Sequence, residues 1–165
     1  MLEKLSQSFV SYYSKLSNEE YSLLGIERIF GGASRETYKI QLKDSLNNIE
    51  RLVLRLTQDS SLIETEQKTE YLAYSAFQNT NVPVPVLVDM SEDDLLLGAP
   101  FMIMKELKGE AASPFTPNIY SPHEEELGFQ FWSILGEVAK HKIEDDIFND
   151  FSVNLANGKV DINDI

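Results

Sequence analysis

Two adjacent glycines between two apolar runs place the strongest constraint on how this 165-residue chain can fold. Gly31 and Gly32 follow the strand-like run 26–30 and precede a second run over 37–42. Because glycine adopts positive φ and lacks a Cβ, such a loop brings backbone N–H groups close to a ligand. Successive N–H groups then form a concave site that suits a phosphate. The same glycines are also compatible with a hairpin turn that binds nothing.

Three further strands are predicted after the glycine pair. Residues 51–56 alternate, with Leu52, Leu54 and Leu56 on one face and Arg51, Val53 and Arg55 on the other. The polar segment 43–48 indicates a turn, so the first three strands form an antiparallel meander. Residues 85–90 and 100–104 are the fourth and fifth strands, and the almost wholly apolar fifth strand is predicted to be central. Val82-Pro83-Val84-Pro85 excludes a helix before the fourth strand.

Apolar spacing predicts helices around these strands. Residues 2–16 carry apolar side chains at helical intervals. Ser17 and Glu20 fit a capping box, which predicts a short second helix to Leu24 that Gly25 ends. Residues 60–79 are predicted as a helix, with a stripe of Ile63, Gln67, Glu70, Tyr74 and Phe77. An N-cap at Ser121 and Pro122 at the first helical position predict a helix to Lys142, and Asn157-Gly158 indicates a hairpin in the tail. Ser91 to Asp94 indicates a turn.

Two charged residues interrupt apolar patterns. Arg55 lies in the third strand, and Glu70 lies on the apolar stripe of the following helix. A buried charge is costly unless it is paired, and a helix folded back on the strand brings these two together. A strand cation held by a helix glutamate is how a kinase-type site orients the α- and β-phosphates. The alternative is that Arg55 faces solvent and Glu70 lies at the edge of the stripe.

Charge and composition limit the partners. The formal net charge of −13 argues against nucleic acid and anionic membranes, which require basic patches. It suits a cationic ligand or a solvated acidic surface. The absence of cysteine excludes disulfides and thiolate catalysis. We find no signal peptide and no run approaching the roughly 18 apolar residues of a membrane span, so we expect a cytoplasmic protein.

In order and spacing, these segments resemble the N-terminal lobe of the aminoglycoside phosphotransferase (choline-kinase-like) family, which has a protein-kinase-like fold. The matching segments are Gly31 to Tyr38, Leu52 to Arg55, Glu70 to Leu72, Val82 to Pro85, Gly98 to Met104 and the helix over Leu135 to His141. The resemblance covers roughly residues 25–145. It implies an α+β fold: a kinase-like N-lobe with a five-stranded antiparallel sheet and a packed helix, N-terminal helices, and a C-terminal helix beginning the second lobe.

The resemblance also divides the chain and assigns roles. Residues 1–24 are an N-terminal helical segment, 25–108 the N-lobe, and 109–165 a linker, helix and tail that start a truncated C-lobe. Gly31, Gly32 and Ser34 would cover the nucleotide phosphates, Arg55 would contact the α- and β-phosphates, and Glu70 would hold Arg55. Met104 would line the back of the adenine pocket, and the backbone of Lys105 to Leu107 would be the hinge that binds adenine. Arg35 stands where the family commonly has asparagine; it either reaches a phosphate or points outward.

The family's catalytic His-Gly-Asp loop and metal-binding aspartate have no match. His123 and His141 are the only histidines, and neither precedes Gly-Asp. The acids after His123 suit the start of a helix better than a metal site. The tail over 157–164 resembles half of a Ca²⁺ loop, but Val153 and Leu155 offer no side-chain oxygen. We therefore expect no catalytic or metal residue in this chain, and Mg²⁺ only with the missing C-lobe.

The resemblance implies the ATP-binding portion of a small-molecule kinase. The complete enzyme would transfer the γ-phosphoryl group of ATP to a substrate hydroxyl, and this chain alone would be inactive. Two alternatives stay open: a non-catalytic kinase-like binding or interaction module, and a plain α+β interaction domain whose glycine loop is only a turn. Apolar surface at the lobe interface would favour self-association.

Overall fold

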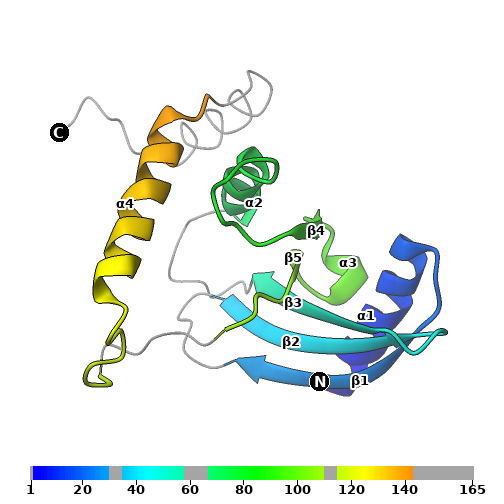
Figure 1. Ribbon diagram of the computed structural model, residues 1–165. Helices are drawn as coiled ribbons and strands as arrows, with labels where there is room; N and C mark the ends of the chain where they lie inside the picture. Colours follow the sequence, from blue (N-terminus) through cyan, green and yellow to red (C-terminus); the bar gives the residue numbers. More distant parts are fainter. Residues whose placement is uncertain (1, 30–34, 58–66, 110–114, 143–165) are drawn as a thin grey trace.

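The computed structural model describes residues 2–29, 35–57, 67–109 and 115–142. Its sheet consists of β1 (Tyr21–Ile29), β2 (Arg35–Asp44), β3 (Ile49–Thr57), β4 (Leu87–Ser91) and β5 (Phe101–Lys105). The strand order is β1-β2-β3-β5-β4, and every neighbouring pair is antiparallel (Figure 1). The predicted five-stranded antiparallel sheet, the meander and the interior position of β5 are therefore confirmed.

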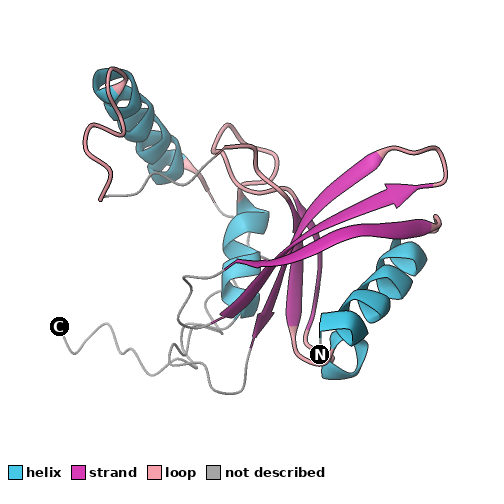
Figure 2. Ribbon diagram, turned by 90° about the horizontal axis from the view of Figure 1, so that it is seen from below, coloured by secondary structure: helices cyan, strands magenta, loops and turns pink. Residues whose placement is uncertain are grey.

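The described residues contain the helices α1 (Leu2–Ser17), α2 (Gln67–Ala76), α3 (Asp94–Leu97) and α4 (Glu124–Lys140). Helix α1 covers one face of the sheet and α2 lies on the other, as the two views together show (Figures 1 and 2). The α1 face holds the main core: Leu5, Phe9, Tyr13, Tyr38, Ile40, Leu42, Leu52, Leu54, Leu56, Leu97, Phe101 and Ile103. Met102 and Met104 alternate with these core residues along β5 and are buried too, so the apolar run of β5 serves both faces.

Residues 17–25 do not form the predicted second helix. The Ser17 hydroxyl donates back to the Tyr13 carbonyl at 2.8 Å, and Asn18, with φ of 55°, follows the end of α1. Tyr21 then begins β1, and its ring packs edge-on against Tyr13 at 5.1 Å. Gly25 lies at an irregularity in the β1–β2 register instead of ending a helix. Strand pairing and this aromatic contact override a capping signal that is purely local.

Residues 91–98 differ from the predicted turn. Ser91 belongs to β4, and Asp93 caps the short α3 by accepting a hydrogen bond from the Leu95 N–H at 2.9 Å. Gly98, with φ of 90°, ends α3 and donates its N–H to the Asp94 carbonyl at 2.7 Å. Aspartate is a favoured N-cap and glycine a favoured left-handed C-cap, so the signals for this single helical turn were present.

The other predicted helices differ mainly in where they begin. Helix α2 covers residues 67–76, while 60–66 lie outside the described residues, as does the predicted tail hairpin. Helix α4 begins at Glu124, with His123 at the N-cap position making no side-chain cap bond. Ser121 does not cap it, because its N–H donates to the Asn118 carbonyl at 3.0 Å within a preceding turn.

Helix α4 stands beside the sheet and its helices (Figure 1). None of its residues is buried. Among the residues that the structure describes, no helix has the length and apolarity needed to cross a bilayer.

Candidate functional site

On the α2 face of the sheet, one carboxylate joins two arginines from adjacent strands. Glu70 of α2 accepts a hydrogen bond from Arg35 of β2 on Oε2 and from Arg55 of β3 on Oε1. The exposed fractions of the three side chains are 8 % for Arg35, 26 % for Arg55 and 20 % for Glu70. We call these three side chains the Arg–Glu–Arg cluster.

The strand register explains why these side chains meet. Arg35 lies opposite Thr57, and Thr37 lies opposite Arg55, so the two arginines are diagonal neighbours on one face. Two guanidinium groups at that spacing repel each other in a partly buried site. The Glu70 carboxylate pairs with both of them and so counteracts that repulsion.

Two further α2 side chains fix the position of Glu70. Gln67, which is 7 % exposed, donates to the Arg55 carbonyl at 2.8 Å and accepts from the Thr57 hydroxyl at 2.6 Å. One helical turn beyond Glu70, the Tyr74 hydroxyl donates to Oε1 of Glu70 at 3.1 Å. Burial raises the pKa of Tyr74 and the Glu70 charge adds to this shift, so the phenol remains a donor. The predicted stripe therefore carries a polar network on this face.

The structure thus brings together Arg55 and Glu70, as the sequence pattern predicted. Arg35, which the sequence left either reaching a phosphate or pointing outward, contacts Glu70. Gly31, Gly32 and Ser34 lie outside the described residues. The supporting contacts of Gln67, Thr57 and Tyr74 were not predicted, although the stripe already placed Gln67 and Tyr74 one turn either side of Glu70.

The predicted hinge follows β5. Met104 is 6 % exposed and pairs with Val53 of β3. The N–H of Lys105 donates to the Val86 carbonyl at 2.8 Å, and the N–H of Glu106 donates to the Arg51 carbonyl at 3.0 Å. These two N–H groups are therefore already used.

Leu107 comes next in the chain and is 63 % exposed. Its N–H makes no backbone hydrogen bond with another described residue. A backbone donor that has no partner and lies in contact with solvent is available to a ligand. Of the three predicted hinge residues, Leu107 is thus the one whose N–H has no backbone partner among the described residues.

A second polar link connects the hinge strand with α1. Glu50 accepts on Oε1 from both the Tyr13 hydroxyl, at 3.2 Å, and the Lys105 amine. Burial lowers the pKa of the Lys105 amine and raises that of the Tyr13 phenol to about 12. Tyr13, Glu50 and Lys105 thus form a continuous contact from α1 to the end of β5.

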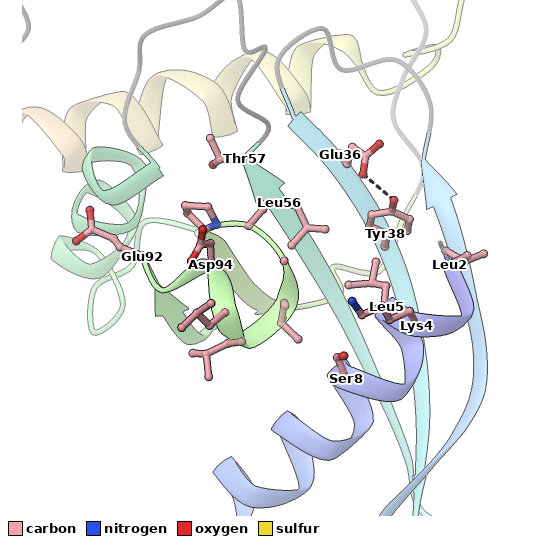
Figure 3. Close-up of a pocket in the computed structure, with 16 residues that line it drawn as sticks. Leu2, Lys4, Leu5, Ser8, Glu36, Tyr38, Leu56, Thr57, Glu92 and Asp94 are labelled. Carbon is pink, nitrogen blue, oxygen red and sulfur yellow. Dashed lines mark hydrogen bonds between the residues drawn. The ribbon is translucent and has the colours of Figure 1, made fainter.

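A pocket of about 750 Å³ lies on the α1 side, between α1, α3 and the ends of β2 and β3 (Figure 3). Its charged lining residues are the acids Glu36, Glu92 and Asp94 and one cation, Lys4. Glu36 accepts a hydrogen bond from Tyr38 at 2.8 Å. An excess of carboxylates repels an anionic ligand, so this pocket does not suit a phosphate. The Arg–Glu–Arg cluster is the better candidate for phosphate binding.

The histidines show no metal-site geometry. Within the described residues there is no group of three or more His, Asp or Glu side chains that could hold a metal ion. His123 Nδ1 lies 3.5 Å from a Glu126 oxygen on the surface. The His141 ring packs against Phe77 with 4.7 Å between ring centres.

Comparison with known proteins places the chain beside one family profile, a curated protein and solved structures. The profile of the family described as "Phosphotransferase enzyme family" matches residues 25–160. Acyl-CoA dehydrogenase family member 10 of Mus musculus is 34 % identical over 80 residues, which are 47 % of this chain and 7 % of that protein. The crystal structure of a candidate aminoglycoside phosphotransferase of Ralstonia eutropha JMP134 superposes with a TM-score of 0.48 at 23 % identity, over 67 % of this chain and 31 % of that one. The chain therefore spans less than a third of the length of either protein.

Proposed function

The chain belongs to the phosphotransferase enzyme family, and we propose that it has a kinase-like fold and is the nucleotide-binding portion of a small-molecule kinase that uses ATP. The observation that carries this proposal is the contact between Arg55 on β3 and Glu70 on α2. A strand cation fixed by a helix glutamate is the arrangement that orients nucleotide phosphates in kinases.

Charge supports phosphate binding at this place. Arg55 and Arg35 face one carboxylate, which leaves one positive charge in excess although the chain has a formal net charge of −13. A guanidinium has five N–H donors, and the recorded contact with Glu70 uses Nη1 of Arg55. The donors that Glu70 does not take can bind phosphate oxygens, for which arginine geometry is well suited.

The hinge supplies the other end of the proposed site. Buried Met104 would border the base, and the N–H of Leu107 would donate to a ring nitrogen of adenine. The loop of Gly31, Gly32 and Ser34 would add backbone N–H donors to the phosphates. The residues present therefore fit a nucleotide whose phosphates point toward Arg55.

Bound ATP would supply the γ-phosphoryl group that a substrate hydroxyl accepts. This chain has two histidines, and neither precedes Gly-Asp, so no carboxylate in the family's catalytic setting is identified. We propose that the 165-residue chain binds the nucleotide without turnover. Mg²⁺ and the acceptor hydroxyl would be held by the C-terminal lobe of the complete enzyme.

The first prediction concerns nucleotide affinity and is tested by titration calorimetry of the 165-residue chain with ATP. Wild type binds, and Arg55→Ala weakens binding about tenfold or more, because a charge-assisted contact to phosphate is lost. Arg51→Ala is the matched control, since Arg51 lies on the same strand and face but is exposed. Its affinity should stay within about twofold of wild type. Equal affinities of all three proteins would contradict the assignment of Arg55.

The alternatives make different predictions. A non-catalytic kinase-like module would bind the nucleotide or a partner, and would still transfer no phosphoryl group when joined to a C-terminal lobe of the family. A plain interaction domain would show no change of thermal stability with ATP, and Arg55→Ala would be neutral or mildly destabilising.

A further inference from the structure

We propose that Arg35 is a positioning residue that occupies one oxygen of Glu70 and thereby keeps Arg55 free to bind phosphate. This inference rests on the proposed function, because it assigns how the nucleotide site is prepared. It explains why a second arginine, absent from the motif that the fold shares with kinases, lies beside the strand cation.

The first step is the distribution of the two carboxylate oxygens. Arg35 takes Oε2 of Glu70, and Arg55 takes Oε1. A guanidinium beside an unoccupied carboxylate tends to form two parallel hydrogen bonds with it. Without Arg35, Arg55 would be able to claim both oxygens and commit a second N–H to Glu70. With Arg35 in place, Arg55 makes one hydrogen bond to Glu70, and the N–H groups that Glu70 does not take can turn toward a phosphate.

The second step is the difference in burial between the two arginines. Arg35 is 8 % exposed, whereas Arg55 is 26 % exposed. A ligand arriving from solvent reaches Arg55 more readily than Arg35. The two side chains therefore have different roles: Arg35 stabilises the Glu70 carboxylate, and Arg55 binds the phosphates.

The third step is the position of Arg35 in the chain. Arg35 is the first residue of β2 and follows directly on residues 30–34, which contain Gly31, Gly32 and Ser34. Its bond to Glu70 ties this end of β2 to α2, while Gln67 ties α2 to β3. The Arg35 side chain thus helps to fix α2, the start of β2 and the Arg55 guanidinium relative to one another before the nucleotide binds.

The experiment measures the dissociation constant of ATP for single and double variants of the 165-residue chain. Arg35→Ala should weaken binding about tenfold, and Arg35→Lys, which can still donate to Oε2, should recover most of that loss. In a Glu70→Gln background, Arg35→Ala should change the affinity by less than about twofold, because the carboxylate through which it acts is gone. Arg35→Met retains most of the apolar stem and serves in place of Arg35→Ala if that variant does not fold.

Arg28→Ala is the control, since Arg28 forms an ion pair with Glu36 at 2.7 Å on a neighbouring strand and is 45 % exposed. Wild-type affinity for Arg35→Ala would overturn the inference while leaving the proposed function intact. An undiminished effect of Arg35→Ala in the Glu70→Gln background would also overturn it, because Arg35 would then contact the nucleotide itself. Failure of the wild-type chain to bind ATP would refute the proposed function, and this inference with it, before any variant is compared.

Discussion

The Glu70 carboxylate receives hydrogen bonds from Arg35, Arg55 and Tyr74, so the α2 face depends on this one acid. An ionised carboxylate has about four lone-pair sites, and three donors nearly saturate it. Removing the acid takes away the carboxylate that the two neighbouring guanidinium groups share. The cost of that loss exceeds the value of any single hydrogen bond in the network.

The stability of a Glu70→Ala variant tests this dependence. We expect a loss of about 1–3 kcal/mol in the free energy of unfolding, as for a partly buried charged group left unpaired. Urea denaturation measures it. Glu137→Ala is the matched control, because Glu137 pairs with Lys140 at 3.6 Å on the surface. This variant should lose less than about 0.5 kcal/mol of unfolding free energy. Equal losses in the two variants would show that the arginines find other partners.

Tyr13 gives a prediction on pH. Burial raises its pKa from 10 to about 12, so the phenol ionises more easily in the unfolded chain than in the folded one. The stabilisation from this difference is fully present below pH 10 and is lost as the pH rises through about 12. In Tyr13→Phe, the fall of unfolding free energy over this interval should be less steep by up to about 1.4 kcal/mol per pH unit. Denaturation at several alkaline pH values compares the slopes, and identical slopes would contradict the assignment.

Sequence alone predicted the meeting of Arg55 with Glu70 because each residue interrupts a regular apolar pattern. It left Arg35 undecided, although Arg35 and Arg55 share a face. The shared face follows from the β2–β3 register, in which Thr37 lies opposite Arg55. The alternation of residues within one strand does not reveal how that strand pairs with its neighbour. The bonds of Gln67 and Thr57 depend on the same register.

At the scale of whole elements, the sheet was predictable because its strands alternate or are continuously apolar. The segment 17–25 was not, since its capping box is a local signal, whereas β1 is formed by distant pairing with β2 and by the Tyr13–Tyr21 contact. Helix α3 is a single turn, too short for an apolar period to develop.

Helix α1 gives an element-level prediction, since it covers the core face of the sheet. Phe9 is fully buried and stacks on Tyr13 at 5.9 Å, so Phe9→Ala should cost about 3–5 kcal/mol of unfolding free energy. Leu16→Ala on the same helix, where the side chain is 44 % exposed, should cost about 1 kcal/mol or less. Chemical denaturation compares the two, and a small loss for Phe9→Ala would mean that α1 does not contribute to the core.

For the molecule as a whole, α4 stands out because it carries several exposed large apolar side chains and no buried residue. Its large apolar side chains that face solvent are Leu127, Phe129, Phe131, Trp132, Leu135 and Val138. Phe131 and Trp132 are 61 % and 69 % exposed and contact each other at 5.5 Å between ring centres. Large exposed apolar patches mark surfaces that bind another surface.

We therefore predict that the chain associates with itself through α4 as its concentration rises. Light scattering should show a molar mass that increases with concentration. The substitutions Phe131→Glu and Trp132→Glu should each suppress the increase, because a charge at an apolar interface is costly to bury. Gln130→Glu, a change of equal charge at an exposed polar position of the helix, should not suppress it. A constant monomer mass over a wide range would refute the prediction.

The Tyr13–Glu50–Lys105 contact has a consequence for evolution. Glu50 is the shared acceptor of a phenol on α1 and an amine at the end of β5. A lineage that loses the acid leaves Lys105 with an unmatched charge in a partly buried setting, which selection would remove by changing the lysine as well. Across homologous sequences, positions 50 and 105 should therefore covary, and tyrosine at position 13 should be retained mainly where the acid remains.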